Sequence, residues 1–223
     1  MARTAENSAI GVDNVVIAKM LNDDVSGVTY DTPIALKGAV QVTANPNSSV
    51  ETDYADNGAF FVVDNRGNLE MNLEMTNVAP DVLAMMLGQK RENGITIEGS
   101  QDQAPYFALG FRVWIGGTDE NGDKIYKLYW FAKGKFSVPE AGGQTKQDNV
   151  SFQHVSMVAQ FVSTIYNGAF GANCRTDYDT PATTIQNWFN QPILSTDADL
   201  SALTVTITKS SNKIEIAPTK ASS

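Results

Sequence analysis

Apolar and polar residues alternate without exception between positions 69 and 76. The apolar positions are Leu69, Met71, Leu73 and Met75, and the polar positions are Glu70, Asn72, Glu74 and Thr76. Successive side chains of a β-strand point to opposite faces, so this pattern predicts a strand with one buried face and one hydrated, acidic face. The acidic face could contact bulk solvent, an active site or another large molecule, and the pattern alone does not decide between them.

Similar patterns predict strands on the N-terminal side of this segment. Residues 15–21 form a short apolar run, and residues 34–44 alternate well enough to predict one long strand. Residues 59–64 and 68–76 are predicted to form a hairpin across Asn65–Arg66–Gly67.

The segment between these strands, residues 45–58, is predicted to be a long extended loop. Turn-forming pairs stand at Asn45–Pro46 and Asn57–Gly58. The segment has no basic residue, and its three acids are Glu51, Asp53 and Asp56.

The second half of the chain is also rich in strand patterns. Residues 105–117 and 124–137 flank Asn121–Gly122, a strong hairpin signal. Further strands are predicted at 150–163, 203–208 and 214–216.

Residues 80–88 carry the clearest helix signals. Pro80 suits the first helical position, Asp81 suits the positive N-terminal end, and Gly88 suits the stop. A second short helix is predicted at 183–190. The fold class that follows is mainly β: a β-sandwich or barrel-like fold with one flanking short α-helix, a long loop and terminal arms.

Charge and cysteine content narrow the classes of function. The chain has 223 residues and a net charge of −9, with 14 acids and 6 bases among residues 1–100. Such a chain lacks the basic patch that neutralises phosphates in nucleic-acid binding. Cys174 is the only cysteine, which excludes an intrachain disulfide and indicates a reducing compartment. The first residues contain no apolar run of the kind found in a secretory signal, so we expect none, and no apolar run approaches the ~18 residues of a membrane helix.

A search for catalytic or metal-binding residues finds no supported site. His154 is the only histidine and lies in a predicted strand. We therefore interpret it as a hydrogen-bonded structural residue and not as a general base or metal ligand. Residues 119–123 resemble the start of a calcium loop but lack its later glycine and glutamate. We therefore expect neither an enzyme nor a bound cofactor or metal.

Lysines and aromatic residues interleave in residues 124–137, as they do in single-strand nucleic-acid platforms. Their spacing favours another interpretation. Tyr126, Leu128, Trp130, Ala132 and Phe136 share one apolar face, while the lysines share the opposite face with Ile125, Tyr129 and Phe131. We therefore interpret 124–137 as a strand with one face in the core and the other, which carries both lysines and apolar residues, at an interface or in solvent.

Several spaced motifs together resemble a known family. They are the early "GVDN" strand, the "GVTYDTP" turn, the "LKGAV" strand and "PNSSVETDYADNG", followed by "APYFALGFR" (104–112) and "KLYWFAKGKFSVPE" (127–140). This set resembles the major tail proteins of long-tailed phages of Gram-positive hosts. The resemblance covers roughly residues 10–165. It implies a tail-tube β-sandwich domain over 14–165 and leaves the role of a C-terminal extension over 166–223 open. Residues 1–13 are small and polar, which by itself predicts a flexible N-terminal arm.

The resemblance implies a structural subunit of a tail tube. Members of that family form hexameric rings that stack into a hollow tube around a tape-measure protein, with tail-terminator and distal tail proteins at the ends. DNA later passes through the lumen transiently and without sequence specificity. The expected location is the virion tail, after assembly in the host bacterial cytoplasm.

The resemblance also suggests two sets of functional residues. The long loop of the family reaches a neighbouring subunit or ring. Here it corresponds to Asn45, Pro46, Asn47, Ser48, Ser49, Glu51, Asp53, Tyr54 and Asp56. The acidic face of 69–76 is expected to line the lumen, since carboxylates repel phosphates. The candidates are Glu70, Asn72 and Glu74, and the alternative is that this face meets solvent.

Two other functions remain open from the sequence. One is a carbohydrate-binding or adhesion β-sandwich, in which Trp114, Trp130 and Trp188 would stack on sugars. The other is the tube protein of a contractile, phage-derived particle. The chain does not distinguish contractile from non-contractile tails, nor does it identify a phage or host.

Overall fold

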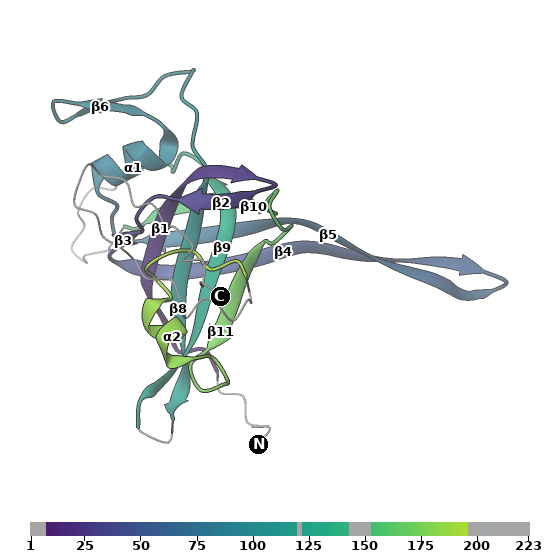
Figure 1. Ribbon diagram of the computed structural model, residues 1–223. Coiled ribbons are helices and arrows are strands. Elements are labelled where there is room, and N and C mark those ends of the chain that lie inside the picture. Colours follow the sequence, from purple (N-terminus) through teal and green to yellow (C-terminus); the bar gives the residue numbers. More distant parts are fainter. Residues whose placement is uncertain (1–7, 120–121, 143–152, 196–223) are drawn as a thin grey trace, which may run out of the picture.

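The computed structural model describes residues 8–119, 122–142 and 153–195, and it is mainly β, as the sequence predicts (Figure 1). The elements in chain order are β1 (Gly11–Asp24), β2 (Gly27–Tyr30), β3 (Ile34–Leu36), β4 (Ala39–Ala55), β5 (Gly58–Met75), α1 (Pro80–Leu87), β6 (Lys90–Glu92), β7 (Ile95–Ile97), β8 (Phe107–Thr118), β9 (Lys124–Phe136), β10 (Val155–Val162), β11 (Gly171–Arg175) and α2 (Ala182–Asn187).

One large antiparallel sheet forms the body of the protein, with the order β2-β1-β8-β9-β10-β5-β4. β3 pairs with β1, next to one end of this order. The chain then continues from β3 into β4, which pairs with β5 at the other end. The sheet therefore closes on itself in a barrel-like arrangement. β11 adds to the edge of β9, and β6 and β7 form a separate small hairpin beside α1.

The interior of the closed sheet is the main hydrophobic core. Met71, Leu73 and Met75 are fully buried there, which confirms the apolar face predicted for 69–76. They pack in one cluster with Phe107 and Phe161. α1 contributes Met86 to the same core, so the barrel is covered at the end where this helix lies.

A second, smaller core lies on the outer side of β1, β8 and β9. Trp130 and Trp188 are both buried in it, and Ile193 packs with them. The Trp130 Nε1–H donates a hydrogen bond of 2.6 Å to the Trp188 carbonyl oxygen. The chain from β11 to residue 195 is thus packed against the barrel.

β9 departs from the single apolar face that its sequence predicts. A register shift separates the pair Leu109–Phe131 from the pair Phe107–Gly134. The extra residue reverses the direction of the following side chains, so Phe136 joins the interior core although Trp130 lies on the outer one. In the middle of β9, Leu128, Trp130 and Ala132 are therefore buried on the outer face, while Tyr129 and Phe131 are half-buried on the inner face.

Residues 34–44 do not form one strand, contrary to the prediction. The chain breaks at Gly38, whose φ of 87° lies in the left-handed region. The carbonyl of Gly38 accepts a hydrogen bond from the Thr76 N–H, and a Cβ at Gly38 would lie 2.2 Å from Thr76 Oγ1. This contact turns the chain from its pairing with β1 to its pairing with β5.

The predicted hairpin across Asn65–Arg66–Gly67 is wrong, and so is the predicted loop at 45–58. β5 runs without interruption through all three residues, and β4 occupies most of the supposed loop. Gly67 is needed for another reason: a Cβ there would lie 2.6 Å from the carbonyl oxygen of Asn47. It marks a register shift in the β4–β5 ladder between the pairs Pro46–Leu69 and Ser48–Arg66.

Other local predictions agree with the structure. α1 spans Pro80–Leu87 and ends at Gly88 in the left-handed conformation. β8 and β9 form the predicted hairpin, and α2 occupies part of 183–190.

The remaining predictions differ in extent or cannot be placed. β1 begins at Gly11, inside the predicted N-terminal arm, and β10 begins at Val155. The strands predicted at 203–208 and 214–216 lie outside the described residues.

Candidate functional site

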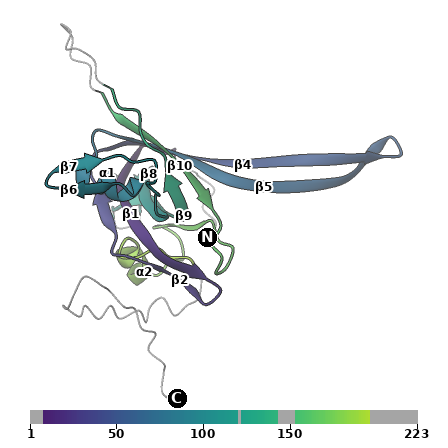
Figure 2. The same cartoon turned by 90° about the horizontal axis from the view of Figure 1, so that it is seen from above.

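The distal part of the β4–β5 hairpin projects away from the barrel, and we call residues 47–67 the arm (Figures 1 and 2). β10 covers the edge of β5 only from Leu69 to Met75. Every residue from 45 to 68 is exposed. At about 3.4 Å per residue, the eight residues from Ser48 to Ala55 carry the tip roughly 27 Å from the root.

A tight turn closes the tip of the arm. Asp56 and Asn57 have φ values of 49° and 64° and connect the paired residues Ala55 and Gly58. Positive φ at both central residues is the signature of the type I′ turn, whose twist matches that of paired strands. The tip is thus closed by a two-residue hairpin turn, where the sequence predicted part of a long loop.

The arm exposes large apolar side chains on both of its faces. Residues paired directly across the ladder share a face, so Phe61 and Val63 lie on the face of Asp53 and Glu51, whereas Val62 lies on the opposite face with Thr52. The exposed fractions are 66% for Val50, 72% for Tyr54, 75% for Phe60, 60% for Phe61, 57% for Val62 and 48% for Val63. A strand with apolar residues on both faces is typical of positions covered on both sides.

Charge is distributed unevenly along the arm. Its acids are Glu51, Asp53, Asp56 and Asp64, and Arg66 at the root is its single base. A partner for the tip would therefore need apolar surface together with a positive charge.

The residues that the resemblance assigned to an inter-subunit loop all lie on this hairpin. Asn45 to Tyr54 belong to β4, and Asp56 is in the turn, so these residues form a strand and a tip where a loop was expected. The aromatic and β-branched residues of β5 opposite them were not among the predicted site residues. The unbroken apolar run from Phe60 to Val63 was a usable signal, since an ordinary half-exposed strand alternates.

The polar face of 69–76 lies on the outside of the barrel, where Glu70 and Glu74 contact β10 and the residue just before it. We call these two glutamates the acidic belt. Gln160 Nε2 donates to Glu70 Oε2 at 2.9 Å, and His154 Nδ1 lies 2.8 Å from Glu74 Oε1. Asn72 is paired with Val158 on one side and with Thr43 on the other. The three lumen candidates are therefore adjacent on one acidic face.

The lysines of β9 are each engaged within the chain. Lys133 Nζ forms an ion pair of 2.7 Å with Asp23, and Lys135 lies 4.5 Å from the centre of the Tyr106 ring. Lys124 and Lys127 lie over Trp114 and Tyr129. Their charges are thus directed at neighbouring side chains of the same chain.

The tryptophans offer little surface for stacking on a sugar. Trp130 and Trp188 are buried in the outer core, and Trp114 is covered by the Lys124 ammonium group at 4.4 Å. In the described ranges, no group of three or more His, Cys, Asp or Glu side chains is placed to hold a metal ion.

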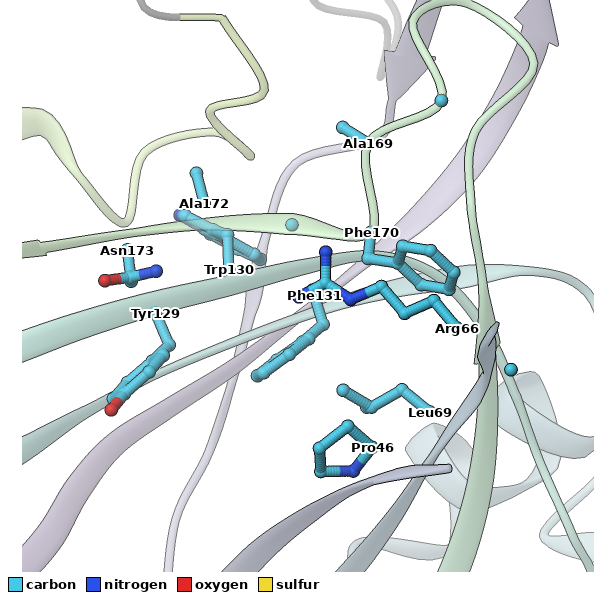
Figure 3. Close-up of a pocket in the computed structure, with 13 residues that line it drawn as sticks. Pro46, Arg66, Leu69, Tyr129, Trp130, Phe131, Ala169, Phe170, Ala172 and Asn173 are labelled. Carbon is cyan, nitrogen blue, oxygen red and sulfur yellow. The ribbon is translucent and has the colours of Figure 1, made fainter. Parts of the chain in front are cut away.

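A pocket of about 360 Å³ opens at the root of the arm (Figure 3). Leu69 and Pro46 line one side, and Tyr129 and Phe131 line another. Arg66 reaches into the pocket beside Phe170.

The aromatic lining of this pocket is continuous with the interior core. Tyr129 and Phe131 stack with ring centres 6.2 Å apart, and Phe111 lies 5.0 Å from Tyr129 behind them. No sequence pattern indicated this pocket, because its walls come from four separate segments of the chain.

Comparisons with known proteins give no family for the chain: neither a protein-family model nor a curated protein matches its sequence. Within the described part of the chain, no helix has the length and apolar character needed to cross a membrane.

Proposed function

We propose that this protein is a structural subunit that assembles with copies of itself into a hollow tube, as the tail-tube protein of a long-tailed phage would. The observation that carries the proposal is the arm, which exposes aromatic and β-branched side chains on both faces. The sequence motifs that resemble the major tail proteins support the same reading. In this proposal stacked hexameric rings surround a tape-measure protein, and DNA later moves through the bore.

The free energy available from burying the apolar side chains of the arm is comparable to the cost of association. Full burial of one Val or Phe side chain contributes about 1.5–3 kcal/mol, so the six exposed side chains together offer on the order of 10 kcal/mol. Association costs an estimated ~4–15 kcal/mol in lost motional freedom. One arm therefore supports at most weak pairing, and stable association requires the several simultaneous contacts of a closed ring or stack.

The strand edges of the arm support the same conclusion. In the described residues, β4 and β5 pair only with each other over the arm, so both outer edges carry unpaired backbone groups. Long exposed edges with apolar side chains promote uncontrolled aggregation unless a specific partner covers them. A neighbouring subunit is such a partner, and ring closure limits the growth of the assembly.

The acidic belt of Glu70 and Glu74 fits the wall of a conduit for DNA. Carboxylates disfavour phosphate contacts, whereas a basic wall would bind the passing polymer in a salt-dependent way. In the proposed tube this face of β5 lines the bore.

Sedimentation velocity of the purified protein over a wide concentration range, combined with negative-stain electron microscopy, tests the proposal. The matched variant lacks residues 50–64 and joins Ser49 to Asn65 through an Asn-Gly turn, because these two residues are paired in the ladder. We expect the full chain to form rings or tubes and the shortened variant to remain monomeric and folded. Monomers of the full chain at high concentration would contradict the proposal.

A further inference from the structure

We propose that the pocket at the root of the arm receives the tip of an arm from a second copy of this chain. This inference rests on the proposed function and adds the location of the docking site. It is based on the shape, lining and charge of the pocket, each compared with the corresponding property of the tip.

The pocket has the size and lining that an aromatic side chain requires. A cavity of roughly 150 Å³ lined by apolar residues is large enough for benzene, and this pocket measures about 360 Å³. Tyr129, Phe131 and Phe170 line it, so an entering ring would meet other aromatic faces. Leu69 and Pro46 add apolar surface to the lining, and Arg66 and Asn173 are its polar side chains.

Phe60 at the tip is the side chain that fits this pocket best. The ladder pairs Asp53 with Phe61 and Tyr54 with Ala59, so Phe60 is the unpaired residue of a β-bulge. Bulges redirect side chains out of the regular ladder. Phe60 is 75% exposed, the largest exposed fraction among the large apolar side chains of the arm.

Charge favours the same pairing. Arg66 lines the pocket, whereas Asp53 and Asp56 lie beside Phe60 at the tip. Opposite charges at the contact favour the correct orientation and oppose alternatives in which like charges meet.

The arm cannot fill the pocket of its own chain. Arg66 and Phe60 are six positions apart on one extended strand, which separates them by roughly 20 Å. The arm also projects away from the barrel in both views (Figures 1 and 2). Tip and pocket are two different surfaces of one chain, so their contact is head-to-tail and repeats from copy to copy until it closes a ring or extends a tube.

Disulfide trapping between differently labelled copies tests the contact. In a Cys174→Ala background, copies with Ala59→Cys, which keep the Phe60 ring, are mixed with copies that carry Asn173→Cys at the pocket wall, and copper–phenanthroline is the added oxidant. The control mixture replaces Asn173→Cys by Val138→Cys, which is 63% exposed and does not line the pocket. We expect at least about tenfold more cross-linked dimer with Asn173→Cys than with Val138→Cys.

Charge reversal provides a second readout that keeps the aromatic lining intact. Arg66→Glu should lower the yield of assembled particles about tenfold, because it places a carboxylate against the acidic tip. Adding Asp53→Lys should restore assembly to within about threefold of the natural chain. Glu92→Lys is the matched control, since Glu92 is exposed on β6 and does not line the pocket, and it should give no rescue.

The outcomes separate this inference from the proposed function. If the natural chain assembles but shows neither selective cross-linking nor rescue, the tip docks elsewhere, and this inference is wrong while the proposed function stands. If the natural chain does not assemble, the proposed function fails and this inference fails with it.

Discussion

Asp53 and Phe61 face each other across the β4–β5 ladder, and Phe61 keeps 60% of its surface exposed. Two residues further toward the root, Glu51 and Val63 repeat the arrangement. This face of the arm therefore carries an acidic stripe along β4 and an apolar stripe along β5. A surface with this pattern is complementary to a partner that supplies apolar contacts beside positive charge.

Replacing Phe61 and Val63 by serine should abolish assembly without destabilising the subunit. Both side chains are largely exposed in the single chain, so the free energy of unfolding should change by less than about 0.5 kcal/mol per site. Sedimentation velocity should show monomers where the natural chain forms large particles. Val138→Ser removes an equally exposed apolar side chain outside the arm and should assemble normally. Normal assembly of the Phe61→Ser/Val63→Ser variant would exclude this face as an interface.

Reversing the acidic belt should convert the tube wall into a DNA-binding surface. Assembled particles of a Glu70→Lys/Glu74→Lys variant should retain at least about tenfold more DNA than natural particles at low salt, and retention should fall steeply as salt rises. The matched control is Glu92→Lys/Glu98→Lys, which changes the net charge equally at exposed positions away from the belt. Equal retention by the two variants would show that the belt does not line the bore.

Asp23 should make a large contribution to stability at neutral pH. Its side chain is 4% exposed, forms an ion pair with Lys133, and accepts a hydrogen bond of 3.0 Å from the Ile165 N–H. Removing one partner of a buried ion pair leaves the other charge uncompensated, so Asp23→Asn should cost about 3 kcal/mol in urea unfolding at pH 7. Glu92→Gln breaks an exposed pair and should cost less than about 0.5 kcal/mol.

The same carboxylate predicts a pH dependence of stability. Burial alone would raise the pKa of Asp23, but hydrogen bonds from Lys133 and from the backbone of Ile165 and Tyr166 lower it below its ordinary value of 3.8. The stabilisation is therefore fully present above pH 3.8 and is lost as the pH falls below that value. The natural chain should lose more stability than Asp23→Asn over this acidic range, and parallel curves for the two proteins would contradict the assignment.

Trp188→Ala should destabilise the whole barrel. The residue is 3% exposed, and its backbone carbonyl accepts the hydrogen bond from Trp130 Nε1. Loss of a buried aromatic side chain costs about 3–5 kcal/mol, whereas Val138→Ala at an exposed site should cost little. Circular dichroism during urea unfolding should show one transition at a lower midpoint. A separate early transition would indicate that residues 171–195 fold independently of the barrel.

Local signals in the sequence were sufficient where one segment determines its own structure. The alternation at 69–76 gave the buried face of β5, and Pro80 with Gly88 gave both ends of α1. Asn121–Gly122 correctly placed the connection between β8 and β9. In each case, side-chain period or turn chemistry acts within a few residues of the feature that it predicts.

Prediction failed where distant pairing decides the structure. Gly67 suggested a turn, yet its role is to allow close approach to Asn47 on the partner strand. Gly38 gave no sign that Thr76 would lie against it. The short strands β2, β6, β7 and β11 were missed because each has too few residues for a clear period and depends on its neighbour for stability.

The functional residues were predicted only in part for the same reason. The acidic side of the arm was found because its residues are consecutive in the sequence, but it was assigned to a loop. The exposed aromatics of β5 and the pocket at the root depend on the register of the β4–β5 ladder and on the meeting of four segments. Neither the exposed aromatics nor the pocket can be predicted from the sequence of one segment alone.

A cryo-electron microscopy reconstruction of the purified protein at high concentration would show directly whether copies assemble through the arm. We predict a hollow particle in which neighbouring copies cover Phe61 and Val63, while Glu70 and Glu74 face the bore. Arms that project freely into solvent, a bore lined by lysines, or a field of single copies would contradict it.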